Sequence, residues 1–250
     1  MIQYNGCKNT HGRKEREYMF SGKMKAVTFS YDDAVSQDIR LIEMFNKYGL
    51  KATFNLNSGL LGKNAILTRE GKDVQHYKIP PVDIAAVYDG HEVAAHTVRH
   101  PLLPKLTDAE ITEQVENDRV ALSELVGYEV VGFAYPGGGV NFDERVANVI
   151  KQTTGIKYAR TAISTHNFEP QTELMTFKPT CYHHAEFDKM FDLAEQFISM
   201  KADTPKIFYI WGHSYEFDIH DTWDKMERFC KLISGHSDIF YGTNKEVLLK

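Results

Sequence analysis

The chain contains 250 residues, of which 42% are hydrophobic and 12% aromatic, and 29 basic against 34 acidic side chains give a formal net charge of −5. This length and apolar content are sufficient for a hydrophobic core, and they exclude an intrinsically disordered chain. The near-neutral balance offers no basic surface for nucleic acid and no polybasic patch for a membrane. The three cysteines are far apart and form no CxxC pair, which indicates neither a disulfide framework nor a thiolate zinc site.

In chain order, apolar segments of strand length alternate with amphipathic segments of helical period. They predict strand 26–29, helix 37–48, strand 52–56, helix 82–88, strand 92–95, helix 107–126, strand 130–135, helix 141–154, strand 157–159, helix 186–200, strand 207–211, helix 222–234 and a weaker strand 239–241. A polar arm at residues 1–23 precedes this pattern, and residues 60–81 interrupt it as a long excursion that is expected to shape access to a site. No repeat, low-complexity tract or linker divides the rest, so residues 24–250 are expected to form a single domain.

Six or seven successive strand–helix units predict a parallel sheet or barrel with helices outside it. Thr107 and Glu110 have the spacing of a capping box and mark the start of the longest predicted helix. In this architecture the residues that carry chemistry gather at the carboxyl ends of the strands. The polar residues that follow each strand are therefore the candidates for a functional site.

Two adjacent carboxylates, Asp32 and Asp33, follow the first predicted strand. Successive side chains of a strand point to opposite faces, so both can reach one site only if the backbone turns there. One interpretation is that an aspartate caps the helix that begins near Ser36. The other assigns one aspartate to a metal and keeps the second as a base.

His96 and His100 follow the strand at 92–95 with the spacing H-x3-H. This spacing places two imidazoles on one side of a turn, where they suit one tetrahedral zinc ion, although two unrelated histidines would give the same pattern. Pro101 favours a loop or a single turn over a continuing helix. Together with Asp33, the two histidines would leave an open position for water, which is typical of a hydrolytic zinc site.

Two further strand ends carry candidate residues. The run Pro136-Gly137-Gly138-Gly139 allows close backbone approach and can direct amide groups at an oxyanion, or it can simply form a turn with positive φ. His213 follows the strand at 207–211 beside Gly212 and an aromatic residue. It suits a general acid that faces a sugar-like ring, and the alternative is a structural histidine.

Aromatic residues also lie close to the strand ends, where they can stack on a sugar ring or simply cover the barrel. These residues are Tyr31, Tyr135, Trp211 and Tyr215. Three further histidines are expected to be ordinary surface or supporting residues: His183, His184 and His220.

Together these motifs resemble the polysaccharide deacetylase family, the NodB-homology domain of carbohydrate esterase family 4. The resemblance extends from about residue 25 to about residue 217, with Asp-Asp, H-T-x-x-H, a Pro-Gly turn and a late histidine in the family's order. It implies a distorted (β/α)7 barrel that binds a divalent metal through Asp33, His96 and His100. Zn²⁺ is the expected ion, with Co²⁺, Ni²⁺ and Mn²⁺ as alternatives because mixed histidine and carboxylate ligands suit several metals.

The same resemblance implies roles for individual residues. Asp32 corresponds to the general base, His213 to the general acid, and the backbone N–H of Gly137 to the oxyanion donor. The chain departs from the family where Ala34 replaces a glycine after the aspartates, and where the family's Arg-x-Pro motif reads Ala134-Tyr135-Pro136.

The arginine that orients the base in the family is therefore missing from its usual position. Arg160, at the end of the next predicted strand, is the expected replacement. The family's Asp-x-x-Asp-Trp motif is not recognisable either, so no partner for His213 is identified, although Glu216 and Asp218 are near it in sequence.

The leading hypothesis is a metal-dependent hydrolase that removes acetyl groups from N-acetylated or O-acetylated sugars. One alternative is an amidohydrolase of a small cyclic amide or ureide, and another is a carbohydrate-binding pseudoenzyme that lost turnover with the missing arginine. A carbohydrate or a small amide is the expected partner, and the sequence indicates no oligomeric state. No hydrophobic leader or membrane-spanning run is apparent, so a cytoplasmic location is expected if residue 1 is the native start.

Overall fold

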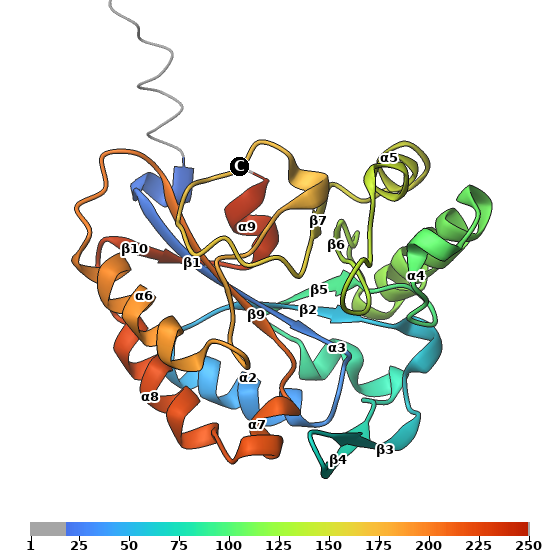
Figure 1. Cartoon of the computed structure of the whole chain (residues 1–250), viewed down its shortest axis with the longest axis horizontal. Coiled ribbons are helices and arrows are strands. Elements are labelled where there is room, and N and C mark those ends of the chain that lie inside the picture. Colours follow the sequence, from blue (N-terminus) through green and yellow to red (C-terminus); the bar gives the residue numbers. More distant parts are fainter. Residues whose placement is uncertain (1–18, 250) are drawn as a thin grey trace, which may run out of the picture.

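The structure of the chain is a computed structural model, which describes residues 19–249. At its centre lies a parallel sheet with the strand order β7-β6-β5-β2-β1-β9-β8, in which β10 also pairs with β1 (Figure 1). The strands of this sheet are β1 (Lys25–Asp32), β2 (Ala52–Leu56), β5 (Glu92–Ala95), β6 (Gly132–Ala134), β7 (Tyr158–Arg160), β8 (Cys181–Tyr182), β9 (Lys206–Gly212) and β10 (Ile239–Tyr241). The predicted arm at residues 1–23 lies largely outside the described residues, which begin with the short helix η1 (Met19–Gly22).

Helices surround the curled sheet, with α2, α6 and α8 packed together on one side and α4 and α5 on another (Figure 1). The α-helices are α2 (Gln37–Tyr48), α3 (Ile84–Val87), α4 (Asp108–Val126), α5 (Glu144–Thr153), α6 (Phe187–Ser199), α7 (Glu216–His220), α8 (Trp223–Ile233) and α9 (Asn244–Leu248). Short 3-10 turns are η2 (Ser58–Leu60), η3 (Pro81–Asp83), η4 (Leu103–Lys105) and η5 (Leu174–Thr176). Within residues 19–249, no helix is both long and apolar enough to cross a membrane.

The long strand β1 forms the middle of the sheet. Every residue from Lys25 to Asp32 is buried, as expected of a central parallel strand that is covered on both faces. Its first half pairs with β10 and its second half with β2, while β9 runs along its other edge. The sheet curls into a half-barrel whose terminal strands are β7 and β8, which confirms the barrel-like α/β fold.

The predicted pattern of strands and helices has a counterpart throughout the described chain, because each outer helix buries one apolar stripe. In α8 the buried residues recur every three or four positions: Trp223, Met226, Phe229, Cys230 and Ile233. The predicted capping box is confirmed at α4, where Thr107 and Glu110 bond each other's backbone N–H, and the helix ends at Gly127 in the left-handed conformation. The sequence did not predict the short elements β8, α7 and α9.

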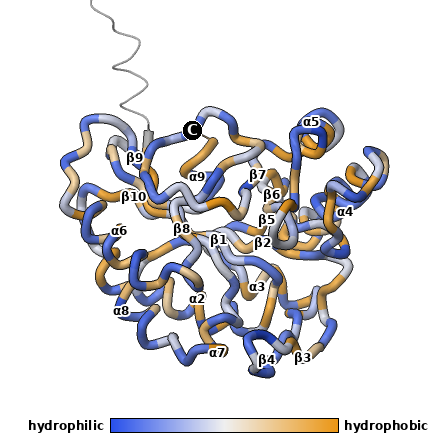
Figure 2. Tube along the Cα trace, viewed as in Figure 1, coloured by the Kyte–Doolittle hydropathy of each residue, from blue (hydrophilic) through white to orange (hydrophobic). Residues whose placement is uncertain are grey.

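The excursion at residues 60–81 contains an unpredicted antiparallel hairpin, β3 (Asn64–Arg69) and β4 (Lys72–Tyr77). Its two-residue turn, Glu70 and Gly71, has φ values of 53° and 75°, as a twisted hairpin requires. An isolated bridge between Val35 and Lys78 joins the end of the hairpin to the start of α2. The hydrophilic colour of β4 in Figure 2 agrees with its exposed position at the edge of the molecule.

Candidate active site

The loops that follow β1 and β5 carry the Asp-Asp and His-x3-His motifs. They contain backbone conformations that residues other than glycine rarely adopt. The φ values are 91° at Asp33, 54° at Ala34, 70° at Thr97 and 59° at His100. Each left-handed residue of this kind costs on the order of 1–3 kcal/mol and persists only where its surroundings hold it. The backbone therefore turns directly after β1, as two adjacent aspartates facing one site require. The helix α2 begins after Ser36 without a side-chain cap, so the capping interpretation is wrong.

One pocket of about 390 Å³ lies at the carboxyl ends of the strands and brings the predicted residues together. Six of the seven predicted site residues line it: Asp32, Asp33, His96, His100, Gly137 and His213. Arg160, the seventh, lies behind the pocket wall against Asp32.

Three of these residues form a group that could hold a metal ion. The ligand atoms of Asp33, His96 and His100 all lie within 4.8 Å of one another. His96 Nδ1 is 2.8 Å from the carbonyl oxygen of Ala134, so it carries the proton and donates it, which leaves the Nε2 lone pair free. This Nε2 is buried and has no hydrogen-bond partner among the described residues. Burial lowers the pKa of His96 to about 4, so the imidazole is neutral at pH 7, as a metal ligand must be.

Asp33 is held in its charged form by two residues of the hairpin segment. Lys78 Nζ lies 3.1 Å from Asp33 Oδ1 and donates to its carbonyl oxygen at 2.5 Å, while His76 Nε2 lies 3.4 Å from Oδ2. Burial by itself would raise the pKa of Asp33, but Lys78 and the surrounding histidines, His76, His96 and His213, together outweigh it and hold that pKa well below the usual range. Neither Lys78 nor His76 was predicted as a site residue.

Asp32 lies in a buried ion pair with Arg160. The Nη2 atom of Arg160 is 2.6 Å from Oδ1 and 2.5 Å from Oδ2 of Asp32, and Asn55 Nδ2 donates to Oδ1 at 2.8 Å. The two charged side chains are only 1% and 4% exposed. Burial would raise the pKa of Asp32, but the Arg160 guanidinium and the neighbouring His96 and His213 together lower it below the usual value, so the carboxylate is ionised.

The position of Arg160 follows from the pairing of two neighbouring strands. In the parallel ladder of β6 and β7, Arg160 is the register partner of Ala134, the residue at the position of the missing arginine. Its guanidinium also lies over the Trp211 ring, 4.5 Å from the centroid. The guanidinium therefore reaches Asp32 from the adjacent strand, at the same level of the sheet.

His213 has a carboxylate partner that the sequence left open. Glu216 lies one helical turn later, with Oε1 3.1 Å from His213 Nδ1 and Oε2 accepting the backbone N–H of His213 at 3.0 Å. Burial would lower the pKa of His213, but Glu216 together with Asp32 and Asp33 outweighs it and raises the pKa to about 9. His213 Nε2 faces both aspartates, 4.0 Å from the nearest oxygen of each. The ring thus lines the pocket with a pKa that favours its protonated form.

Gly137 occupies a position where the backbone favours glycine. Its φ is 81°, and a Cβ atom there would lie 2.8 Å from Leu102 Cδ2. The Asn141 side chain holds this loop by donating to the carbonyl oxygens of Gly137 at 2.8 Å and Tyr135 at 3.1 Å. The positive-φ turn is therefore confirmed, and it places the Gly137 backbone at the pocket wall.

The aromatic candidates divide into two groups. Tyr135, Trp211 and Tyr215 line the pocket. Tyr31 does not, since it is fully buried and packs 5.5 Å from the His183 ring in the core. Arg69 of the hairpin completes the wall and donates to the Tyr215 hydroxyl at 2.9 Å, so the excursion at residues 60–81 borders the pocket.

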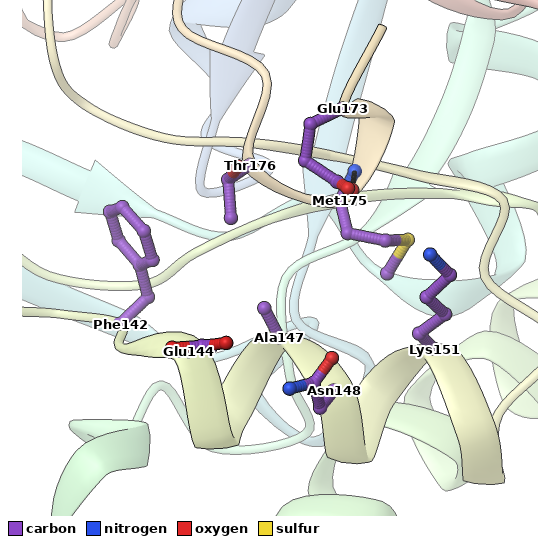
Figure 3. Close-up of a pocket in the computed structure, with 8 residues that line it drawn as sticks. All are labelled: Phe142, Glu144, Ala147, Asn148, Lys151, Glu173, Met175 and Thr176. Atoms are coloured by element: carbon purple, nitrogen blue, oxygen red, sulfur yellow. Dashed lines mark hydrogen bonds between the residues drawn. The ribbon is translucent and has the colours of Figure 1, made fainter.

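A second pocket of about 350 Å³ lies between α5 and η5, away from these side chains. Figure 3 shows Ala147, Asn148 and Lys151 on α5 facing Met175 and Glu173 across it. None of the residues singled out from the sequence lines this pocket. The chemistry-bearing side chains are gathered at the strand ends instead.

Comparisons with known proteins are consistent with this geometry. A family model described as polysaccharide deacetylase matches residues 21–159. A peptidoglycan-N-acetylglucosamine deacetylase of Bacillus cereus is 28% identical over 115 residues, which cover 44% of this chain and 36% of that protein. A peptidoglycan-N-acetylmuramic acid deacetylase of Bacillus subtilis is 25% identical over 132 residues, covering 52% and 25%. The chain spans between a quarter and about a third of the length of the curated relatives it matches.

Solved structures with low sequence identity share the fold. A family 4 acetyl xylan esterase from Clostridium thermocellum, in complex with a cobalt ion, has a TM-score of 0.55 at 15% identity, covering 90% of this chain and 91% of that one. A family 4 carbohydrate esterase pseudoenzyme from Bacillus anthracis has a TM-score of 0.53 at 17% identity, covering 90% and 66%. At these identities the likeness concerns the fold, and function depends on the site.

Proposed function

Because the chain belongs to the polysaccharide deacetylase family, we propose that it is a metal-dependent hydrolase that removes acetyl groups from N-acetylated or O-acetylated sugars. The observation that carries this proposal is the buried, unpartnered Nε2 of His96 beside Asp33 and His100. A polar atom that is buried without a partner loses the hydrogen bonds it makes in water, and a metal ion would compensate that loss.

The three ligands fit a divalent ion of the zinc type. Two neutral imidazoles and one ionised carboxylate are the donor set of a catalytic zinc site with an open position, and Co²⁺, Ni²⁺ and Mn²⁺ accept the same donors. When bound, such an ion would polarise the acetyl carbonyl and lower the pKa of water from about 15.7 towards about 7. The cobalt complex of the Clostridium thermocellum acetyl xylan esterase supports this assignment.

Asp32 would act as the general base. Its carboxylate is ionised and borders the same pocket as the metal ligands, so it can take a proton from the attacking water. Arg160 and Asn55 fix its orientation and leave it close to the proposed metal position. The pseudoenzyme hypothesis rested on a missing arginine, and the guanidinium of Arg160 on Asp32 removes that reason.

Gly137 would act on the carbonyl oxygen of the acetyl group, and His213 on the atom that leaves. The Gly137 backbone N–H would donate to the oxyanion that forms on the acetyl carbonyl, and the loss of one such donor typically costs about 2.7–4 kcal/mol. His213 would pass its Nε2 proton to the departing sugar nitrogen or oxygen, for which a protonated ring is required. Tyr135 and Tyr215 would offer ring surface to the sugar, whereas the Trp211 ring is already in contact with the Arg160 guanidinium and the Tyr182 ring.

The test is acetate release from N-acetylglucosamine oligomers and from O-acetylated xylan, with Zn²⁺ or with a chelator. Asp32→Asn is the control variant, because it removes the base and leaves the three metal ligands intact. We expect release that needs both the metal and Asp32, with Asp32→Asn still binding Zn²⁺. If the variant lost Zn²⁺ together with activity, the roles of the two aspartates would be reversed. Metal binding without acetate release from either substrate would contradict the proposed function.

A further inference from the structure

A second group of metal-ligand side chains lies at the rim of the pocket, formed by three segments that are distant in sequence. Glu70 is in the turn of the β3–β4 hairpin, His184 follows β8, and His220 is the last residue of α7. The ligand atoms of these three residues all lie within 4.8 Å of one another. We propose that Glu70, His184 and His220 form a second divalent-metal site, separate from Asp33, His96 and His100, that joins the hairpin to the rim.

Both imidazoles contact the Glu70 carboxylate. Glu70 Oε1 lies 2.9 Å from His184 Nε2, and Oε2 of the same carboxylate lies 2.8 Å from His220 Nε2. The two imidazole rings are 5.0 Å apart, centroid to centroid. Two histidine nitrogens and a carboxylate are a zinc-type donor set, and the Nε2 atoms can exchange their hydrogen bonds to Glu70 for bonds to the ion once the ring proton resides on Nδ1.

The exposure of the group permits an ion to enter and keep water. The side chains of Glu70 and His220 are 47% and 44% exposed, and that of His184 is 11% exposed. A partly exposed site of three protein ligands leaves room for a bound water, and its affinity is lower than that of a closed structural zinc site. The ordinary alternative is a pair of hydrogen bonds from two histidines to one carboxylate, with no metal.

The site would act on the hairpin and not on the reacting bond. Arg69, which precedes Glu70, lines the catalytic pocket, and Lys72 Nζ already donates to the carbonyl oxygen of Ile219 at 2.6 Å. An ion held by Glu70, His184 and His220 would fix the hairpin turn beside β8 and α7. Its expected effect is slower opening of the hairpin, because the ion adds a cross-link between three elements.

The experiment measures Zn²⁺ binding with the full chain by equilibrium dialysis and elemental analysis, with Co²⁺ absorption as a second readout. The background variant carries Asp33→Asn and His100→Gln, which remove two ligands of the proposed catalytic ion. We expect this background to retain one zinc ion per chain and to lose it when His184→Gln and His220→Gln are added. The matched control is His166→Gln, because His166 also pairs with a partly exposed carboxyl group, that of Glu186, and belongs to neither metal-ligand group.

Each result decides the proposal. The proposal is supported if zinc is retained in the background variant and in the His166→Gln control, and is lost when His184→Gln and His220→Gln are added together. Hydrogen exchange then provides a check that folding defects do not mimic, because zinc should slow exchange in β3 and β4 only while both histidines are present. A background variant that binds no zinc overturns the proposal, as does zinc that remains after both histidines are replaced. A wild-type chain that binds only the rim ion would contradict the catalytic metal site and leave the rim site standing.

Discussion

Replacement of Arg160 by methionine isolates the role of the guanidinium that contacts Asp32. The change keeps a long side chain on β7 and leaves the Asp32 charge buried with the Asn55 amide as its remaining side-chain hydrogen-bond donor. Removing one partner of a buried ion pair costs about 3–5 kcal/mol, so we expect the free energy of unfolding to fall by that amount. Without the arginine, the burial that raises the pKa of Asp32 has less opposition, so this pKa should rise and the carboxyl group should take up a proton at a higher pH than in the wild type.

A protonated Asp32 cannot accept the proton of the attacking water. General-base catalysis contributes roughly 10²–10⁴-fold, so kcat/KM for acetate release should fall by about that factor and recover as the pH rises. Urea unfolding and the pH profile of kcat/KM measure the two effects. The control is Arg145→Met, which removes an exposed pair with Asp108 and should change stability by less than about 1 kcal/mol. A wild-type pH profile in Arg160→Met would refute the reasoning.

The register of β6 and β7 provides a rescue experiment for the same idea. Because Ala134 and Arg160 are cross-strand partners, the double variant Ala134→Arg, Arg160→Ala moves the guanidinium by one strand without changing its level in the sheet. We expect the double variant to recover at least about tenfold in kcat/KM over Arg160→Ala, which is about 1.4 kcal/mol of transition-state stabilisation. Equal activity of the two variants would show that Arg160 does more than supply charge to Asp32.

Three further results are expected. Glu216→Gln removes the carboxylate that raises the pKa of His213 to about 9, so the alkaline limb of the kcat/KM profile should move to lower pH. Burial lowers the pKa of His91 from 6.5 to about 4, so the folded state binds fewer protons and stability falls as the pH drops below about 6.5. Between pH 7.5 and pH 5, the free energy of unfolding measured with urea should therefore fall by about 2 kcal/mol less in His91→Gln than in the wild type. Zn²⁺ at about 100 times its Kd should add about 2.7 kcal/mol to the free energy of unfolding, and a chelator should reverse this gain in calorimetry.

The sequence predicts those parts of the site that depend on local spacing. Asp32, Asp33, His96 and His100 each follow a strand whose apolar pattern is plain, and parallel strands bring such ends together. Arg160 was also predictable, because it too ends a strand, although its contact with Asp32 spans 128 residues.

Other partners depend on elements that the sequence marks weakly. His76 lies on β4 and Lys78 directly follows it, in an antiparallel hairpin segment whose Glu-Gly turn lacks the usual Asn-Gly signal. The bridge between Lys78 and Val35, in the loop before α2, holds this segment beside Asp33. Glu216 carries a usable signal, since its spacing of three residues from His213 matches one helical turn. Asn55 could have been found as a polar residue within the otherwise apolar end of β2.

The left-handed backbone of the loops after β1 and β5 places a cost on folding. Asp33, Ala34, Thr97 and His100 adopt conformations that each cost on the order of 1–3 kcal/mol, and their surroundings must offset that free energy. The strain lowers the stability of the fold at the point where the proposed metal ligands lie. An ion bound by Asp33, His96 and His100 would offset part of this cost, which links retention of the folded chain to the supply of its ion.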